Sequence, residues 1–277
     1  MLNKEFQKYL SVLLDQPVTN IFPVSGGDIS LAYHVKTEAN AYFLKVNKGY
    51  EAFKMFQTEK AGLETIARTQ TISVPKVYGC DALENEAFLL MEFIESKSPS
   101  SLDFQNLGLK LAELHRQTND NFGLDFNNYI GSLLQSNSFN SSWVDFYTSE
   151  RLLPQIKIAK DRGLLAKNEC PSKSTLIENL DYLFSNIKPS LLHGDLWSGN
   201  YLISTDGVPY LIDPAVYYGH NDVDIAMSKL FGGFGDDFFE AYYSLLPNDS
   251  KTDSRIEIYQ LYYLLVHLNL FGRSYYR

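Results

Sequence analysis

Cysteine is scarce in this sequence of 277 residues, and basic side chains are outnumbered by acidic ones. The two cysteines, Cys80 and Cys170, supply neither a zinc-ligand spacing nor a disulfide framework, which favours a reducing compartment. The five histidines are scattered and form no HExxH motif. Lysine and arginine number 24 against 33 acidic residues, for a net charge of −9. A nucleic-acid partner is not expected, because phosphate binding needs a basic surface.

Long hydrophobic runs are also missing. The longest apolar stretch, 261–271, contains His267 and Asn269 and is too short to span a bilayer. Residues 1–16 carry apolar side chains at helical spacing rather than the unbroken apolar core of a secretory signal. We therefore expect a cytoplasmic protein with no membrane partner.

The overall composition is that of a globular protein. Hydrophobic residues make up 45% and charged residues 21% of the sequence, which excludes a disordered chain, a collagen and a coiled coil. The length allows one large domain or two smaller ones. A folded chain of this size buries about three quarters of its unfolded surface, so it needs no disulfide for stability.

The pattern of apolar residues changes near Phe93. Before this point, short apolar runs bounded by turn residues predict strands around one helix at 51–68. Beyond it, helical spacing dominates and one short β element interrupts the helices. Strands are predicted at 21–24, 31–37, 41–46 and 88–94, a short extended segment at 74–79, later helices at 100–114, 143–159, 175–187, 224–231, 238–245 and 256–271, and the β element at 191–213. We predict an α+β fold with a small sheet-rich lobe at 1–93, a larger, mostly helical lobe at 94–277, and a cleft between them.

The strongest chemical signal is the segment 191–213, in which Asp206-Gly207 is a turn signal between two apolar strands. A two-residue turn there sets a register in which Asn200 lies directly opposite Asp213. Opposed side chains have Cβ atoms roughly 5 Å apart, so their oxygens can share one Mg²⁺. Asp195, in a tight loop at the mouth of the hairpin, can reach the same space. The alternative is a surface hairpin with polar ends.

The spacing of these residues matches a kinase. The pattern His193-x-Asp195-x-x-x-x-Asn200, followed by Asp213, is typical of a kinase catalytic loop and its metal-binding aspartate. In such a site Asp195 is the base that orients an acceptor hydroxyl, while Asn200 and Asp213 hold Mg²⁺ and phosphates. His193-Gly194-Asp195 by itself indicates only the superfamily.

The amino-acid sequence around these residues indicates a more specific family. It resembles the fructosamine kinase, or ketosamine-3-kinase, family, which belongs with the aminoglycoside phosphotransferases and choline kinases. The resemblance lies in His193–Asn200, Asp213-Pro214-Ala215, Tyr217–His220, Asp224–Met227 and Leu230–Phe234, and extends to Asn128–Gly131 and Trp143–Gln155. It implies a two-lobed protein-kinase-like fold, ATP and Mg²⁺ as cofactors, and phosphorylation of the 3-hydroxyl of a ketosamine. The phosphorylated product would then release its amine, which is deglycation.

The first lobe contains a lysine that could hold the nucleotide phosphates, as a kinase requires. Lys45 lies near the end of the apolar run 41–46, and Glu59 is the acid within an apolar helix stripe. The rest of that stripe is Phe56, Leu63 and Ile66. Since a charge in an apolar stripe should be paired, we predict that Glu59 orients Lys45. The alternative is that Glu59 lies at the edge of the stripe and is solvated.

A glycine-containing loop at 25–30 is expected to cover the phosphates. The backbone N–H groups of Gly26 and Gly27 can approach a phosphate closely, and the resemblance places the loop, including Ser30, over the nucleotide. Asp28 stands where some family members carry a cysteine, so it cannot act as a thiol switch.

The resemblance also implies roles next to the nucleotide and the catalytic loop. Backbone groups of Glu92, Phe93 and Ile94, at the end of the last strand of the first lobe, are expected to hold the adenine. His115 and Asp224 are expected to support the catalytic loop rather than take part in the chemistry.

Family position suggests residues for the acceptor as well. A sugar-like substrate needs an aromatic surface and a few hydrogen-bonding groups. The candidates are Trp143, Arg151, Trp197, Tyr218 and His220. Each of them is equally compatible with a packing role.

The expected partner is a ketosamine, either a small molecule or an adduct on a protein, and the oligomeric state is open. Two other functions remain. One is a kinase of the aminoglycoside or choline type with a different hydroxyl acceptor, and the other is a non-catalytic binding module with a kinase fold. The full set of Lys45, Glu59, Asp195, Asn200 and Asp213 argues against the binding module, because a dead homologue commonly lacks one of them.

Overall fold

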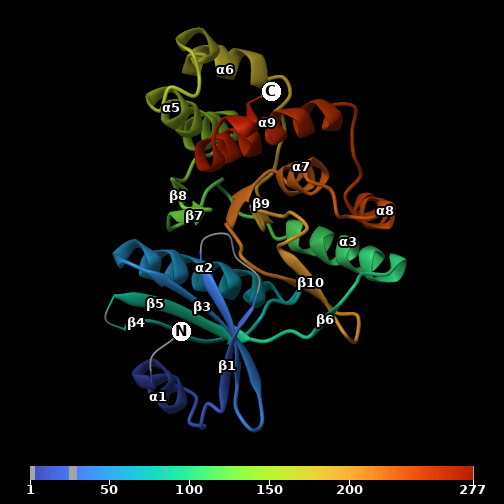
Figure 1. Cartoon of the computed structure of the whole chain (residues 1–277). Coiled ribbons are helices and arrows are strands. Elements are labelled where there is room, and N and C mark those ends of the chain that lie inside the picture. Colours follow the sequence, from blue (N-terminus) through green and yellow to red (C-terminus); the bar gives the residue numbers. More distant parts are fainter. Residues whose placement is uncertain (1–3, 25–29, 84, 277) are drawn as a thin grey trace.

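A computed structural model of the chain describes residues 4–24, 30–83 and 85–276 (Figure 1). An antiparallel five-stranded sheet forms the N-terminal region, and helices dominate the C-terminal region. The α+β fold predicted from the sequence is therefore confirmed. Within the described residues, no helix is both long enough and apolar enough to cross a membrane.

The N-terminal sheet has the strand order β1-β2-β3-β5-β4. Its strands are β1 Asn20–Val24, β2 Leu31–Lys36, β3 Ala41–Lys48, β4 Val77–Leu83 and β5 Glu86–Glu92. Side chains alternate along β3, so Leu44 points to one face of the sheet and Lys45 to the other. Helix α1 (Lys4–Leu13) packs on the Leu44 face and helix α2 (Tyr50–Thr69) on the opposite face (Figure 1). Lys45 therefore lies beneath α2.

The C-terminal region is built from helices around small pieces of sheet. The helices are α3 Ser101–His115, α4 Trp143–Phe146, a π-helical turn Tyr147–Leu152, α5 Leu153–Asp161, α6 Lys173–Leu180, α7 Asp222–Leu230, α8 Asp236–Leu245 and α9 Thr252–Phe271, with 3₁₀ turns at Lys167–Glu169 and Arg273–Tyr275. The strands pair as β6 (Ser96–Lys97) and β11 (Pro209–Leu211) with β10 (Tyr201–Ser204), β12 (Tyr217–Gly219) with β9 (Ser190–Leu192), and β7 (Asn128–Ile130) with β8 (Leu133–Gln135). The β9 and β10 strands bracket the predicted catalytic loop.

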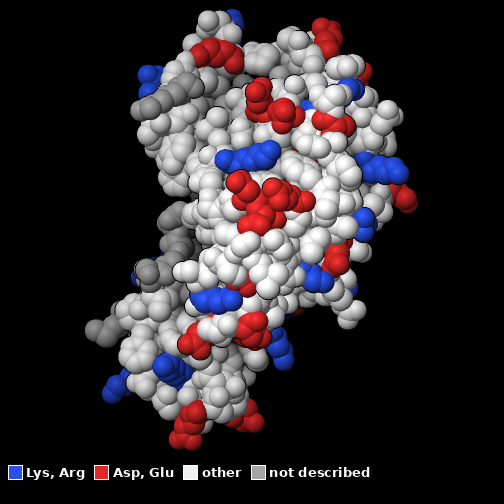
Figure 2. All heavy atoms as spheres, turned by 90° about the vertical axis from the view of Figure 1, so that its right-hand side faces the viewer, with Lys and Arg blue, Asp and Glu red and all other residues white. Residues whose placement is uncertain are grey.

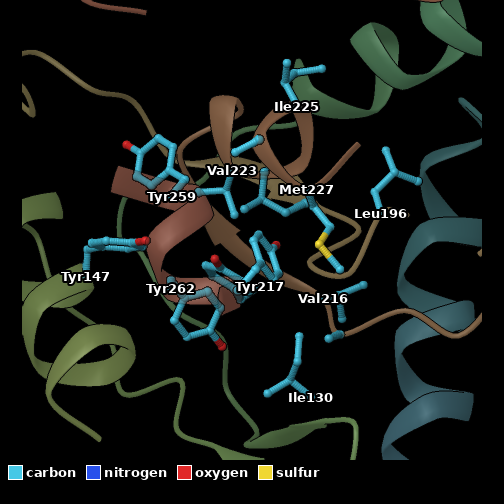
Figure 3. Close-up of a cluster of buried hydrophobic side chains, with 14 of the residues drawn as sticks. Ile130, Tyr147, Leu196, Val216, Tyr217, Val223, Ile225, Met227, Tyr259 and Tyr262 are labelled. Atoms are coloured by element: carbon cyan, nitrogen blue, oxygen red, sulfur yellow. The ribbon is translucent and has the colours of Figure 1, made fainter. Parts of the chain in front are cut away.

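Aromatic side chains fill the core of the C-terminal region. Figure 3 shows tyrosines, including Tyr259 and Tyr262 of α9, gathered with Val223, Ile225 and Met227 of α7. The fully buried Leu196 belongs to the same cluster. Because Leu196 follows Asp195 directly, the core anchors the predicted catalytic loop to α7 and α9.

The shortest elements differ from the sequence predictions. The strands β7, β8 and β12 have only three residues each, which is too short for a periodic pattern, and none of them was predicted. The extended segment predicted at 74–79 corresponds to a longer strand, β4, and the helix predicted at 175–187 ends at Leu180.

The predicted register of the 191–213 hairpin is wrong by one residue. Tyr201 pairs with Leu211, and Ile203 with Pro209. Gly207 has φ +88°, the left-handed conformation that closes a three-residue hairpin loop instead of the expected two-residue turn. Asn200 therefore lies opposite Ile212, whose N–H donates to the Asn200 carbonyl at 3.0 Å, and not opposite Asp213.

Acidic and basic side chains are intermingled on the surface seen in Figure 2, which is the right-hand side of Figure 1. Acidic side chains form the largest cluster on this face. This distribution agrees with the net charge of −9. Among the described residues, this face presents no continuous basic surface of the kind that nucleic-acid phosphates require.

Candidate active site

Lys45 joins the two regions of the molecule. Its ammonium donates to Glu59 Oε1 of α2 at 2.8 Å and also to Asp213 Oδ1, which follows β11. The predicted contact between Lys45 and Glu59 is present, and the solvated alternative for Glu59 is wrong because its side chain is only 15% exposed. The two carboxyl groups thus share one ammonium.

The electrostatics of this cluster follow from its burial. Burial, opposed by the Lys45 ammonium and assisted by the Asp213 charge, raises the pKa of Glu59 to about 8. Burial also acts against ionisation of Asp213, but the Lys45 ammonium outweighs it and lowers the pKa of that carboxyl. Asp213 is therefore the carboxylate that stays charged at neutral pH.

Asp213 reaches Lys45 because of an unusual backbone. Its φ of +55° is the left-handed conformation that aspartate tolerates better than most residues. This conformation ends the alternation of β11 and redirects the side chain. The predicted approach of Asp213 to Asn200 by direct cross-strand pairing is wrong, since the hairpin register is shifted, yet Asp213 still lies in the same site.

Asp195 and Asn200 lie in one compact loop between β9 and β10. The Asn200 amide Nδ2 donates to the Asp195 carbonyl at 2.9 Å and to its carboxylate Oδ2 at 3.3 Å. The Asn200 N–H closes a turn on the Trp197 carbonyl at 2.9 Å. Gly194 has φ +86°, and a Cβ there would collide with the Ala215 carbonyl oxygen. Only glycine therefore fits between this loop and the segment that follows Asp213.

The loop is held from behind by buried groups. The Asp224 carboxylate, in the first turn of α7, accepts the N–H groups of His193 at 2.7 Å and Gly194 at 2.8 Å. His115 Nε2 lies 3.0 Å from the same carboxylate, and Tyr263 donates its hydroxyl to the Gly194 carbonyl at 2.9 Å. The supporting role predicted for His115 and Asp224 agrees with these contacts.

The surroundings of Asp195 favour its protonated form. Burial, together with the negative charges of Asp213 and Asp224, raises the pKa of the Asp195 carboxyl to about 7, while the Asn200 amide opposes the shift. A base whose pKa lies near the working pH transfers protons most effectively. The geometry thus gives the site one charged carboxylate next to a lysine and a second, more basic carboxylate in the loop.

Comparison with known proteins places this arrangement in a family. A family model described as fructosamine kinase matches residues 2–277. The chain belongs to the fructosamine kinase family. A probable ketoamine kinase of Enterococcus faecium is 41% identical over 259 residues, covering 92% of this chain and 91% of that protein. The chloroplastic protein-ribulosamine 3-kinase of Arabidopsis thaliana is 40% identical over 267 residues, covering 93% of this chain and 79% of that protein.

Solved structures share the fold. A putative fructosamine-3-kinase from Haemophilus somnus superposes with a TM-score of 0.86 at 29% identity, covering 98% of this chain and 90% of that one. A spectinomycin phosphotransferase, solved with ADP and spectinomycin, superposes with a TM-score of 0.62 at 14% identity, covering 100% and 89% of the two chains. The second likeness concerns the fold alone. The protein-kinase-like fold implied by the resemblance is confirmed, and membership of the fructosamine kinase family makes this protein a kinase.

Three of the predicted acceptor residues of this kinase are buried. Trp143 is 3% exposed and donates its indole N–H to the Tyr259 hydroxyl at 2.9 Å. Arg151 is 0% exposed; its guanidinium lies 3.9 Å from the centre of the Tyr217 ring and donates to the Ser136 carbonyl. Both side chains are committed to the core, and their positions contradict a direct contact with substrate.

His220 lies at the opposite end of β9 from the catalytic loop. It follows Gly219, which pairs with Ser190 at the start of β9, whereas Asp195 lies beyond the end of β9. Its Nδ1 contacts the Tyr259 hydroxyl at 3.0 Å. The side chain lines a separate cavity of about 520 Å³ together with Arg116, Lys188 and Lys251. This position also contradicts the predicted contact with the acceptor.

Trp197 and Tyr218 are the remaining acceptor candidates, and both are half-buried. The Trp197 ring covers Gly199, where an added Cβ would collide with it, so the indole lies within the catalytic loop itself. Tyr218 exchanges two backbone hydrogen bonds with Gly123 at 2.9 and 3.0 Å. Among the predicted acceptor residues, Trp197 is therefore the one that the structure places beside Asp195.

Sequence reasoning missed a partly exposed aromatic surface, formed by Phe231, His267, Phe271 and Tyr275. The His267 ring centroid lies 4.6 Å from that of Phe231, 5.5 Å from that of Phe271 and 5.1 Å from that of Tyr275. Phe231 is 38% and Phe271 52% exposed. The spacing of four between His267 and Phe271 on α9 was the available signal.

This aromatic surface lies beside the catalytic loop. The segment after Phe231 contacts the catalytic loop, because a Cβ on Gly233 would collide with Ser198 of that loop. The Gly233 carbonyl also accepts the Tyr201 hydroxyl at 2.9 Å. The residues just after Phe231 therefore contact the loop that carries Asp195 and Trp197.

The predicted nucleotide-binding segments are only partly described. Gly26, Gly27 and Asp28 lie outside the described residues, whereas Ser30 accepts a hydrogen bond from Asn47 Nδ2 at 3.4 Å. Glu92 ends β5, and its carboxylate accepts the Lys76 N–H at 3.2 Å.

Phe93 stacks on His34, with ring centroids 3.9 Å apart, immediately before Ile94. His34 pairs with Phe43, two residues before Lys45 on the same face of the sheet. The predicted adenine segment therefore begins next to the Lys45 face.

We expect the reaction to slow in acid as Asp195 takes up a proton. Below a pKa of about 7 its carboxyl is protonated and cannot accept the proton of a substrate hydroxyl. In steady-state assays, kcat/KM for nucleotide should level off above about pH 8 and fall by roughly tenfold per unit well below pH 7. A flat profile down to about pH 5 would contradict the assignment.

Proposed function

We propose that this protein transfers the γ-phosphate of ATP to the 3-hydroxyl of a ketosamine, a sugar joined to an amine by glycation. The observation that carries the proposal is a family match over residues 2–277 combined with a complete kinase constellation in space. Support for the acceptor comes from the relatives, named a ketoamine kinase and a protein-ribulosamine 3-kinase.

In this proposal the two regions of the protein have different functions. Residues 1–93 bind the nucleotide, with Lys45 neutralising phosphate and Glu59 fixing the direction of its ammonium. The loop at 25–30 covers the phosphates, and Glu92, Phe93 and Ile94 hold the adenine. Residues 94–277 carry the catalytic loop and the acceptor site.

The residues present fit a magnesium ion held together with nucleotide phosphates. Asp213 offers a carboxylate and Asn200 an amide oxygen, and Mg²⁺ usually takes one or two such protein ligands beside phosphates and water. Asp213 also already attracts a cation, since the Lys45 ammonium contacts it. In the described part of the chain, no three or more His, Cys, Asp and Glu side chains are arranged to hold a metal by themselves. When bound, the ion would neutralise charge on the transferred phosphate.

Asp195 is the catalytic residue of the proposal. Its carboxylate would accept a hydrogen bond from the acceptor hydroxyl, align it with the phosphate and take its proton late in the transfer. The Asn200 amide holds this carboxylate in place at 3.3 Å. The raised pKa of Asp195, about 7, makes it a better proton acceptor than an ordinary aspartate.

The acceptor would lie between Trp197 and the aromatic surface of Phe231, His267, Phe271 and Tyr275. Apolar faces of a sugar pack on aromatic rings, and the ammonium of a ketosamine is attracted to them. A phosphate at O3 also explains deglycation. Enolisation toward the amine-bearing C1 makes C3 allylic, the phosphate leaves, and hydrolysis of the resulting imine frees the amine. We propose that the protein acts on such adducts in the cytoplasm, where its two free cysteines stay reduced.

A panel of acceptors tests the proposal against its rivals. We expect fructosyl- and ribulosyl-lysine, free or in a peptide, to be phosphorylated with kcat/KM at least about tenfold above kanamycin or choline, since one missing set of contacts costs about that much. ADP release measures the turnover, with Asp195→Asn as the control for contaminating kinases. Faster turnover of an aminoglycoside or of choline would identify a different acceptor class. Turnover of no acceptor would indicate a binding module.

A further inference from the structure

The backbone at Asp213 needs support from its surroundings. A non-glycine residue at φ +55° is held in a sparsely populated conformation, which persists only where neighbouring contacts fix it. The residues that follow, 214–216, lead directly into β12. Whatever holds the carbonyl groups of this short segment therefore also sets the direction of the Asp213 side chain.

A buried network of hydrogen-bonded side chains connects this segment to the hairpin formed by β7 and β8. Asn128 Nδ2 donates to the Val216 carbonyl at 2.8 Å, and Asn128 Oδ1 accepts Gln135 Nε2 at 2.8 Å. The Tyr262 hydroxyl, on α9, donates to Gln135 Oε1 at 2.7 Å. Asn128, Gln135 and Tyr262 are each at most 3% exposed. Each of these hydrogen bonds orients the next side chain in the network, so the buried core fixes the position of the Val216 carbonyl.

The opposite side of the segment is packed against α2. A Cβ on Gly62 would lie 3.1 Å from Pro214 Cγ and 3.4 Å from Val216 Cγ2. The helix therefore approaches the segment so closely that a side chain at position 62 would be crowded. Gly62 lies one turn beyond Glu59 on the same helix, so this contact also helps to fix the position of Glu59 relative to Asp213.

The hairpin is attached to α2 as well. Tyr129, next to Asn128, donates its hydroxyl to Glu51 Oε2 at 3.0 Å in the first turn of α2. One short hairpin thus contacts both the helix that carries Glu59 and the segment that follows Asp213. The sequence 128–131 is one of the segments in which the chain resembles its family, and the proposed chemistry assigns it no part.

We infer that Asn128 is a positioning residue for Asp213: by holding the Val216 carbonyl it fixes the left-handed turn that aims the Asp213 carboxylate at the cation site. Gln135 and Tyr262 orient the Asn128 amide. The inference rests on the proposed role of Asp213 in binding Mg²⁺ with nucleotide. Without the Asn128 donor, the segment can relax toward ordinary backbone angles and the carboxylate leaves its place.

The test is the gain in ADP affinity that Mg²⁺ provides, measured by calorimetry with and without the metal. Asn128→Asp keeps the size and the acceptor for Gln135 Nε2 but removes the donor to Val216, and Asn128→Ala removes both. We expect either variant to lose about two- to tenfold of the Mg²⁺-dependent gain, the range for one hydrogen bond. ADP affinity without Mg²⁺ should change by less than about twofold.

A matched control separates positioning from simple loss of stability. Ile130→Val, in the same hairpin and 2% exposed in the wild type, destabilises the core without touching the Val216 carbonyl. It should keep the full Mg²⁺ gain even if its melting temperature falls as far as that of the Asn128 variants. An equal loss of the gain in Ile130→Val would show that Asn128 is only a packing residue.

Asp213→Ala distinguishes failure of this inference from failure of the proposed function. Loss of the Mg²⁺ gain in Asp213→Ala, with full retention in both Asn128 variants, would overturn the positioning role alone. Retention in Asp213→Ala would overturn the metal assignment of Asp213, and the positioning role with it.

Discussion

Asp195→Asn is expected to lower kcat by at least about a hundredfold, because general-base help is typically worth that much or more. The change keeps the volume of the side chain and its contact with the Asn200 amide, while it removes the charge and the basicity. Affinity for Mg²⁺-ATP should change by less than about tenfold, since Asp195 is placed outside the Lys45, Glu59 and Asp213 cluster. Steady-state turnover with a ketosamine and calorimetry with Mg²⁺-ATP measure the two effects separately.

Asp206→Asn is the matched control for this experiment. Asp206 is an exposed aspartate in the β10–β11 turn whose carboxylate contacts only nearby Ser204 among the hydrogen bonds of the described residues. Its replacement should leave kcat within about twofold of wild type. If Asp195→Asn instead lost nucleotide affinity and retained most of its kcat at saturating ATP, Asp195 would be a metal ligand or a structural residue.

Asp213→Ala is expected to abolish the Mg²⁺-dependent part of nucleotide binding and to lower kcat by more than about a hundredfold. Metal stabilisation of a transferred phosphoryl group is worth several kcal/mol, and this carboxylate is the charged ligand proposed for it. The fold should survive, because Lys45 keeps Glu59 as a partner at 2.8 Å after Asp213 is removed.

Calorimetry with ADP, with and without Mg²⁺, and a thermal melt check this prediction. An unchanged affinity for Mg²⁺-ADP would contradict the assignment of Asp213. A protein that no longer melts cooperatively would instead show that Asp213 is needed mainly to neutralise Lys45.

Periodicity together with the kinase pattern was enough to predict the first half of the site, the pair of Lys45 and Glu59. The apolar stripe of α2 is strict, with Phe56 3%, Leu63 1% and Ile66 0% exposed. An acid within such a stripe must face the sheet, where Lys45 is the available cation. The pairing of Lys45 with Glu59 therefore follows from the local stripe of α2 and from the lysine that a kinase requires.

The second half of the site, formed by Asp195, Asn200 and Asp213, depended on backbone conformations that the sequence does not specify. Asp-Gly suits both a two-residue turn and the end of a three-residue loop, and the choice of the latter moved the register by one residue. The left-handed turn at Asp213 then compensated for the shift. Such a turn is fixed by tertiary contacts, including the Asn128 bond to Val216 at 2.8 Å, and leaves no local signal.

The acceptor residues were the least predictable. Aromatic and basic side chains suit a sugar site and a packed core equally well, and only the three-dimensional structure separates the two. It places Trp143 and Arg151 in the core and His220 at the end of β9 away from the catalytic loop. It also reveals Phe231, which lies beside the catalytic loop only because the chain turns back toward Ser198 after α7.

Phosphoryl transfer to O3 of a ketosamine can be followed on the product itself by ³¹P and ¹³C NMR. After incubation of fructosyl- or ribulosyl-lysine with ATP and Mg²⁺, we expect one new phosphate ester whose two-bond phosphorus–carbon coupling is at C3. Free lysine and inorganic phosphate should then appear together as that ester decays. A phosphate ester on another sugar oxygen, or ATP hydrolysis with no phosphate ester on the sugar, would exclude transfer to O3.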